Sequence, residues 1–135
     1  MSYKNTAFVL LGGNIEPRKS FLQEAEEKIN LKSGYISNKS AIYETEAWGF
    51  ESENNFLNIL LKVETNYSAN ELLNSLLEIE MKLGRKRNKS QGYSSRTLDA
   101  DIIYFNNDII NEKDLIIPHP RLQLRKFVLE PLCEI

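Results

Sequence analysis

Two aspartates, Asp99 and Asp101, are the residues of this chain whose type and spacing most directly suggest chemistry. They begin a run that continues through the apolar and aromatic residues 102–105, a composition typical of a buried β-strand. In a strand, residues i and i+2 point to the same face, so the two carboxylates would lie side by side. Two like charges this close are costly unless a cation lies between them, and Mg²⁺ prefers oxygen ligands and is often shared with substrate phosphates. The pair therefore indicates a magnesium site.

A cationic segment directly precedes the two aspartates. Between residues 82 and 98 the chain has no acidic residue but six basic ones, which are Lys82, Arg85, Lys86, Arg87, Lys89 and Arg96. The simplest alternative is a solvated strand end next to an ordinary basic surface loop. A metal site beside a cationic loop is, however, typical of enzymes that transfer phosphate groups, because such transfer depends on positioning and charge neutralisation.

The composition of the whole chain limits what this segment can bind. Its 135 residues, with 41% hydrophobic and 27% charged side chains, are typical of a globular protein, and we expect residues 1–135 to form a single domain. The formal net charge of −2 argues against a nucleic-acid-binding protein and favours a small anionic ligand. Cys133 is the only cysteine, which excludes an intrachain disulfide. With no signal peptide and no apolar run of membrane-spanning length, we expect a cytoplasmic protein without a membrane partner.

The hydrophobic periodicity predicts an α+β domain that would position these residues. Strands are predicted for residues 7–11, 35–45 and 56–65 and from residue 99 onward, and helices for residues 17–31 and 68–83. The second helix begins with a capping box, Ser68-Ala69-Asn70-Glu71. The resulting order β-α-β-β-α-β is that of the ferredoxin-like sandwich, in which an antiparallel sheet has both helices on one face. A C-terminal extension would consist of a hairpin at residues 106–110, an apolar segment at residues 115–117 and a helix over residues 121–129.

Two further polar residues lie within these predicted elements. Asn58 is on the strand face opposite the leucines of residues 56–65, where its amide could bind the polar edge of a flat heterocycle or could simply be a surface side chain. Glu80 falls on or beside the apolar side of the second helix, and the simpler interpretation is a partly exposed position at the helix edge. The chain has no Walker-type loop, and its only histidine, His119, excludes a multi-histidine zinc site. Catalysis would therefore depend on acidic and basic side chains together with a metal ion.

Several of these stretches, in this order, resemble the 6-hydroxymethyl-7,8-dihydropterin pyrophosphokinase family over essentially the whole chain. The matching blocks are Leu11-Gly12-Gly13-Asn14, residues 40–45, Phe56-Leu57-Asn58, Ile79-Glu80 with Gly84-Arg85, residues 96–101, Pro118-His119-Pro120-Arg121, and Arg125 with Phe127-Val128-Leu129. Members of this family have a ferredoxin-like core and transfer the terminal pyrophosphoryl group of ATP to the hydroxymethyl group of the pterin, releasing AMP, in folate biosynthesis. The resemblance therefore implies an ATP- and Mg²⁺-dependent pyrophosphokinase.

The resemblance also implies a role for each matching residue. Asp99 and Asp101 would hold two Mg²⁺ ions, and Arg85 and Arg96 would act with them in catalysis by closing on the phosphates. The residues implied in ATP binding are Glu80, Arg85, Arg87, Arg96, Ile102, His119 and Arg125. Those implied in pterin binding are Thr45, Trp48, Phe56, Asn58, Tyr93 and Phe127. The partners would be ATP and the pterin, and we expect a monomer, with a dimer as the alternative.

Two other functions are compatible with the same residues. The first is a non-catalytic ferredoxin-like regulatory domain that binds a small anion and oligomerises through its sheet, although this leaves the two aspartates unexplained. The second is a different Mg²⁺-dependent enzyme, such as a nucleotidyltransferase, which would release pyrophosphate instead of AMP. The identity of the nucleotide product distinguishes all three functions.

Overall fold

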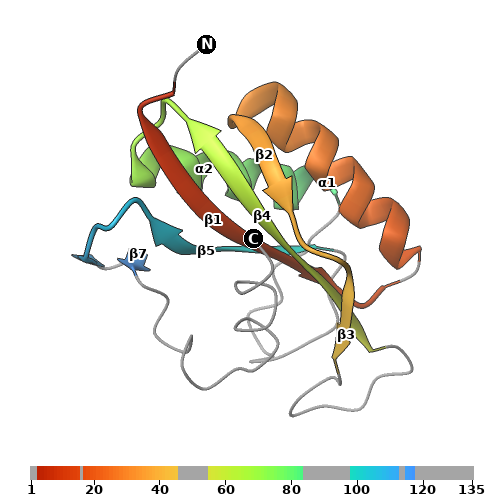
Figure 1. Cartoon of the computed structure of the whole chain (residues 1–135). Coiled ribbons are helices and arrows are strands. Elements are labelled where there is room, and N and C mark those ends of the chain that lie inside the picture. The colour runs from red at the N-terminus through yellow and green to blue at the C-terminus, as the bar shows by residue number, and fades with distance from the viewer. Residues whose placement is uncertain (1–2, 16, 46–54, 84–97, 113–114, 118–135) are drawn as a thin grey trace.

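The computed structural model describes residues 3–15, 17–45, 55–83, 98–112 and 115–117 (Figure 1). The elements within these ranges are β1 (Asn5–Gly13), α1 (Arg18–Lys32), β2 (Tyr35–Lys39), β3 (Tyr43–Thr45), β4 (Phe56–Thr65), α2 (Ala69–Lys82), β5 (Asp99–Phe105), β6 (Ile110–Glu112) and β7 (Leu115–Ile117). They confirm the predicted α+β class and the predicted order of the core elements. None of the described helices has the length and apolar character needed to cross a membrane.

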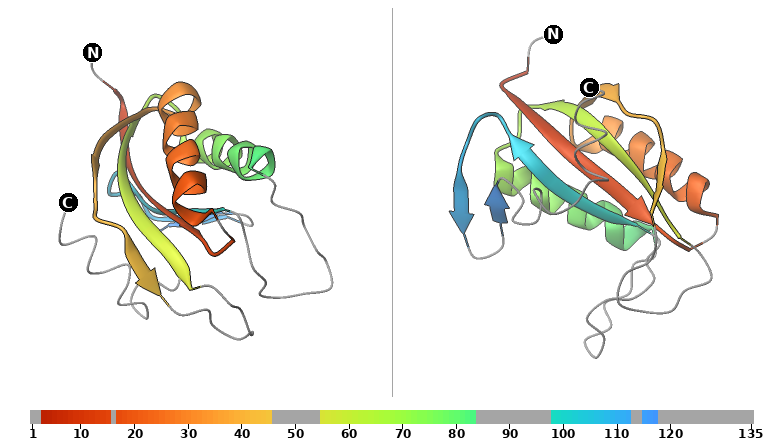
Figure 2. Two further views of the ribbon diagram at one scale, coloured as in Figure 1. Left: turned by 90° about the vertical axis from the view of Figure 1, so that its right-hand side faces the viewer. Right: turned by 60° about the horizontal axis from the view of Figure 1, so that its bottom comes forward.

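The larger of the two sheets interleaves two β-α-β units. Its strand order is β2-β4-β1-β5, β3 also pairs with β4, and every pairing is antiparallel. Both helices pack against one face of this sheet, which we call the helix face, and Figure 2 shows them together on that side. The other side of the sheet is called the opposite face. Because β1 and β4 are the central strands, they contribute to both faces along their whole length.

The helix face contains most of the hydrophobic core. Alternate residues of β1 and β4 point toward the helices, and α1 and α2 each add three or more buried side chains. The buried residues of this core include Val9, Leu11, Leu22, Ile29, Ile59, Leu61, Leu72, Leu76, Ile79 and Ile102. The predicted capping box is confirmed at the start of α2, where the Glu71 N–H donates to Ser68 Oγ at 3.2 Å and the Ser68 N–H donates to Glu71 Oε1 at 2.9 Å.

A smaller apolar cluster lies on the opposite face. Leu10, Leu60 and Ile103 are buried there, and Phe8 and Tyr104 pack against them with their rings edge to face, 6.4 Å apart. Strand β5 has a bulge at this point, because its register to β1 shifts between Phe8 and Val9. The extra residue lets Ile103 and Tyr104 share one face although they are adjacent in sequence.

Residues 35–45 form two short strands instead of the single predicted strand. Ser40, which separates them, is buried and donates its N–H to the Leu60 carbonyl at 2.9 Å. Its Oγ accepts the Leu60 N–H at 3.0 Å and donates to the Ala41 carbonyl at 2.8 Å. A side-chain hydroxyl thus takes the place of a backbone carbonyl, which interrupts the ladder between β2 and β3.

The predicted hairpin after β5 is wrong in its pairing. The chain does turn where expected, because Asn106 has a left-handed φ of 52° and the Asp108 N–H donates to the Phe105 carbonyl at 3.0 Å. Beyond this turn, however, β6 pairs with β7 in a separate two-stranded sheet. The helix expected over residues 121–129 lies outside the described residues.

Candidate active site

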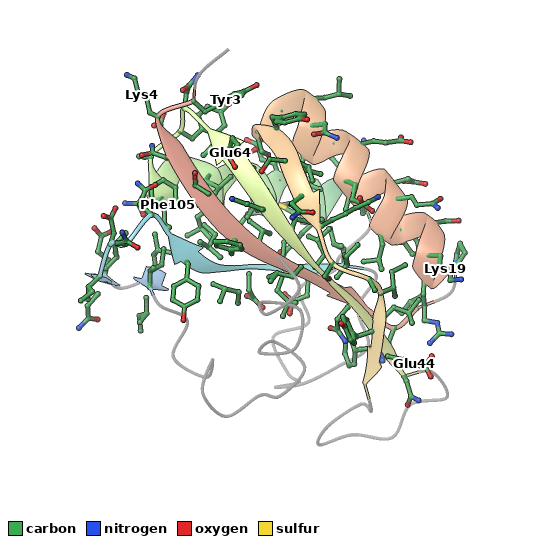
Figure 3. The ribbon with its side chains drawn as sticks, in the orientation of Figure 1. Tyr3, Lys4, Lys19, Glu44, Glu64 and Phe105 are labelled. Carbon is green, nitrogen blue, oxygen red and sulfur yellow. The ribbon has the colours of Figure 1, made fainter. Side chains whose placement is uncertain are left out.

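One row of residues crosses the opposite face from β3 to β5. Tyr43 is directly opposite Asn58, Asn58 is opposite Gly12, and Gly12 is opposite Asp99. Residues opposite each other in an antiparallel sheet point to the same side, with Cβ atoms about 5 Å apart. Asn58 and Asp99 therefore flank Gly12 on the same face. The row lies toward the end of the sheet marked by Glu44 in Figure 3.

Gly12 leaves room for the side chain of Asn58. A Cβ atom built on Gly12 would lie 2.8 Å from Asn58 Oδ1, closer than real Cβ contacts occur. The amide of Asn58 thus lies over the bare backbone of β1, in the direction of β5. Asn58 is only 5% exposed, so the interpretation as a simple surface amide is wrong. The prediction that the first strand ends at residue 11 and that Gly12 begins its exit turn is wrong, because β1 continues to Gly13. A glycine inside a strand often marks such a close approach.

The two aspartates lie on the opposite face of β5, as their spacing predicts. Asp99 is opposite Gly12 and Asp101 is opposite Leu10, and both are partly exposed, while Ala100 between them is buried. Within the described residues, no third acidic, histidine or cysteine side chain joins them in a cluster that could hold a metal ion. Two accessible carboxylates fit Mg²⁺, which usually keeps several waters or substrate phosphate oxygens among its ligands.

Glu80 approaches the same strand from the helix side. The Ala100 N–H donates to Glu80 Oε1 at 2.7 Å, and the side chain of Glu80 extends from α2, which contacts β5. Glu80 is 2% exposed, so the expected partly exposed position at the helix edge is wrong. The physical reason is that Glu80 lies beside the apolar side of α2, where β5 packs against the helix and the Ala100 N–H satisfies the carboxyl group.

Three further residues implied by the resemblance lie within the described part of the chain. Thr45 is opposite Phe56 at the outer end of the β3–β4 pairing, and Phe56 is partly buried two residues before Asn58 in β4. Ile102 is 4% exposed and belongs to the core on the helix face. A ligand on the opposite face would therefore reach Ile102 through its backbone.

The remaining residues that the resemblance implies lie outside the described residues. They are Trp48, Arg85, Arg87, Tyr93, Arg96, His119, Arg125 and Phe127. The described site therefore combines the two aspartates, Asn58 and Gly12 on one face with Glu80 behind β5.

An ion pair that sequence reasoning missed joins α1 to β3 beside the site. Arg18 Nη1 donates to Glu44 Oε2 at 3.2 Å and to the Asn55 carbonyl at 2.9 Å. Arg18 thereby connects the beginning of α1 to the two chain segments that form the β3–β4 end of the row. The side chain of Arg18 is 22% exposed, so solvent screens the ion pair, which is expected to be weak.

The chain matches proteins of known family along nearly its whole length. Residues 8–135 match the family model described as 7,8-dihydro-6-hydroxymethylpterin-pyrophosphokinase, HPPK. The 2-amino-4-hydroxy-6-hydroxymethyldihydropteridine pyrophosphokinase of Bacillus subtilis is 40% identical over 132 residues, covering 97% of this chain and 78% of that relative. The protein of the same name from Aquifex aeolicus is 38% identical over 130 residues, covering 96% of this chain and 79% of that relative.

Solved structures with the same fold belong to longer proteins. The wild-type HPPK-DHPS of Plasmodium falciparum, crystallised with pteroate, superposes with a TM-score of 0.72 at 16% identity. Another HPPK-DHPS, crystallised in complex with substrates, gives a TM-score of 0.72 at 18% identity. The match covers 98% of this chain in both cases, but only 39% and 40% of those chains. At such low identity the likeness supports the fold alone.

Proposed function

Because this chain belongs to the 7,8-dihydro-6-hydroxymethylpterin-pyrophosphokinase family, we propose that it transfers the pyrophosphoryl group of ATP to 6-hydroxymethyl-7,8-dihydropterin in folate biosynthesis. The hydroxymethyl oxygen forms a bond to the β-phosphorus, and the bond from that phosphorus to the oxygen bridging the α- and β-phosphates breaks. AMP leaves with the bridging oxygen, and the hydroxyl proton passes to water. The single observation that carries the proposal is the row in which Asn58 and Asp99 flank Gly12 on one face.

Asn58 is proposed to recognise the pterin. A carboxamide has both donors and an acceptor, which match the donor and acceptor groups along the amide-like edge of a pterin ring. Its low exposure, 5%, favours a fixed orientation over a mobile surface amide. Phe56 on the same strand face and the backbone of Thr45 would border the ring on the β3–β4 side. Trp48, Tyr93 and Phe127 stay predictions for the remaining contacts.

Asp99 and Asp101 are proposed to hold Mg²⁺, with two ions inferred from the family resemblance. Their spacing and partial exposure support this, because both carboxylates lie on one face and remain accessible to phosphate oxygens. Bound Mg²⁺ would neutralise charge on the triphosphate and stabilise the attacking and leaving oxygens. The two aspartates would thereby hold the phosphates on the same face as the proposed pterin-binding amide, across β1 from it.

The nucleotide side of the site is proposed from the same resemblance. Arg85, Arg87 and Arg96 would contact the phosphates, and guanidinium groups match phosphate oxygens geometrically. His119, Arg125 and the backbone of Ile102 would bind the rest of ATP, and Glu80 is treated separately below. The cytoplasmic location and the monomeric state stay predictions.

We assign the fold to the ferredoxin-like sandwiches. The antiparallel order β2-β4-β1-β5 and the two helices on one face support this assignment, since β3 only extends the β2 edge. The hairpin of β6 and β7 would be the first part of the C-terminal extension.

Product analysis tests the proposed function directly. The protein is incubated with ATP, Mg²⁺ and 6-hydroxymethyl-7,8-dihydropterin, and nucleotides are separated by chromatography, with omission of the pterin and addition of a chelator as controls. AMP that forms only with pterin and metal supports the proposal. Release of pyrophosphate would indicate a nucleotidyltransferase, and pterin binding without turnover would indicate a non-catalytic binding domain.

A further inference from the structure

A buried carboxyl group contacts the backbone midway between the two aspartates. Glu80 Oε1 lies 2.7 Å from the Ala100 nitrogen and accepts its hydrogen bond, and Glu80 is 2% exposed. The acceptor comes from α2 on the helix face, whereas the carboxylates of Asp99 and Asp101 are on the opposite face. Glu80 therefore contacts β5 at its backbone, on the other side of the strand from the proposed metal ligands.

The position of β5 in the sheet explains why this contact matters. Strand β5 is at the end of the order β2-β4-β1-β5, so within the described sheet only β1 pairs with it. In an antiparallel strand, successive N–H groups point alternately to the two sides. Since the Ala100 N–H points to Glu80, the N–H groups of Asp99 and Asp101 face β1. Glu80 thus supplies the acceptor that a further strand would otherwise provide at Ala100.

The contact also distinguishes one register of β5 from the next. A shift of one residue would present Asp99 or Asp101 to the helix face and move every side chain of the strand to the other side. Ala100 is the residue whose small side chain is buried in the core on the helix face while its N–H reaches Glu80. Fixing this backbone group fixes the direction of the two neighbouring carboxylates.

We propose that Glu80 is a positioning residue whose carboxyl group holds β5 at Ala100, so that Asp99 and Asp101 present their carboxylates side by side. This inference rests on the proposed function, because it assigns those carboxylates to the metal. It differs from the role implied by the family resemblance, in which Glu80 contacts ATP. A positioning residue affects metal affinity, whereas a nucleotide contact affects ATP affinity even when no metal is present.

Three substitutions separate these roles. Glu80→Gln keeps an oxygen acceptor in place, Glu80→Asp shortens the side chain by one methylene and withdraws it from Ala100, and Glu80→Ala removes it. The matched control is Glu78→Ala, because Glu78 is an exposed glutamate of the same helix. Thermal unfolding establishes that each variant is folded, and Glu80→Asp replaces Glu80→Ala if the latter does not fold.

The main measurement is Mn²⁺ binding by electron paramagnetic resonance, with saturating α,β-methylene-ATP. Positioning predicts that Glu80→Ala and Glu80→Asp weaken Mn²⁺ binding by about tenfold or more, the loss typical when a residue that orients a metal ligand is removed. Glu80→Gln and Glu78→Ala should bind Mn²⁺ as the wild type does. Binding of the same nucleotide in the presence of a chelator should be equal in all variants.

Two results would overturn the proposal. If Glu80→Gln loses as much Mn²⁺ affinity as Glu80→Ala, the oxygen acceptor is not what matters. If the variants bind Mn²⁺ normally but bind the nucleotide weakly without metal, Glu80 contacts ATP. Failure of the proposed function can be told apart from failure of this inference. A wild-type protein that binds Mn²⁺ but forms no AMP would refute pyrophosphoryl transfer. The Mn²⁺ affinities of the variants would still test the role of Glu80.

Discussion

The two faces of the sheet are made by the same strands but carry different properties. On the helix face of β4, Leu57, Ile59 and Leu61 pack into a core to which many side chains contribute. On the opposite face of the same strand, Asn58 is buried next to a glycine and in one row with Asp99. Stability on the first face is shared among many apolar contacts, whereas the proposed chemistry on the second depends on a few polar atoms. Alternate residues of one strand should therefore affect stability and activity separately.

The largest expected effect is on the opposite face. Replacing Asp99 or Asp101 by alanine should reduce turnover by at least about a thousandfold, because a lost metal ligand removes several kcal/mol of transition-state stabilisation. The melting temperature should change little, since both side chains are partly exposed and neither belongs to the hydrophobic core. Activity and thermal unfolding are measured together, with Asp108→Ala, an exposed aspartate in the turn after β5, as the control. Wild-type turnover in either variant would refute the metal assignment.

On the helix face we expect a loss of stability without a loss of turnover. Leu61→Ala should destabilise the protein by about 2–5 kcal/mol, because Leu61 is fully buried and its loss leaves a cavity. The turnover of the molecules that remain folded should be unchanged. Urea denaturation gives the free energy of unfolding, and activity is measured well below the denaturation midpoint. A loss of turnover comparable to that in the aspartate variants would show that the two faces are not separable.

A smaller effect tests the space that Gly12 leaves for the amide. Gly12→Ala places a methyl group 2.8 Å from Asn58 Oδ1, so the amide must move. We expect pterin affinity to fall by about tenfold, the loss from roughly one displaced hydrogen bond, with Mn²⁺ affinity unchanged. Titration calorimetry with the pterin measures this effect. In an Asn58→Ala background the same substitution should add little, and a full additional loss would mean that Gly12 acts independently of Asn58.

The smallest effect concerns Glu64, a polar residue on the opposite face but at the far end of β4, near Tyr3 and Lys4 (Figure 3). Partial burial opposes its ionisation, but hydrogen bonds from Ser37 and Thr6, both at 2.6 Å, and the charge of Lys62 outweigh burial and hold the pKa of Glu64 below its usual value. A depressed pKa stabilises the folded state above the ordinary pKa of a glutamate, and this stability is lost as the pH falls through the depressed value.

The pH dependence of unfolding measures this contribution. Thr6→Val removes one of the two hydrogen bonds, so the stability lost between neutral and acidic pH should be slightly smaller than in the wild type. Turnover should be unaffected, because Glu64 is remote from the row that contains Asn58. The control is Glu27→Gln, which removes an exposed glutamate of α1. Identical pH profiles for Thr6→Val and the wild type would show that this hydrogen bond contributes nothing measurable.

Local patterns were sufficient to predict the core elements and the direction of the two aspartates. The period of two placed Asp99 and Asp101 on one face, and the sequence of the capping box placed the start of α2. These features depend on residues that are neighbours in the chain, and their physical causes are therefore visible in a short window.

Features that depend on distant contacts could not be predicted in the same way. The interruption at Ser40 results from its hydrogen bonds to Leu60, and the burial of Glu80 results from β5 packing over α2. The row through Gly12 depends on the register of two strand pairings, which no local pattern specifies. The arginines implied by the resemblance lie outside the described residues, as do Trp48, Tyr93 and Phe127, and their roles stay predictions.

The central position of β1 has a consequence for how the protein folds. Strand β1 precedes the other described elements in the chain, but its partners β4 and β5 come much later, and the hydrogen bond from the Thr6 N–H to Asn106 Oδ1 spans 100 residues. Closing such long loops is slow, so the pairing of β1 with β5 is expected to be a late step in folding. Asn58, Gly12 and Asp99 come together only when that pairing forms. A partly folded chain would therefore have no complete site, and substrates would act as ligands that select and stabilise the fully folded protein.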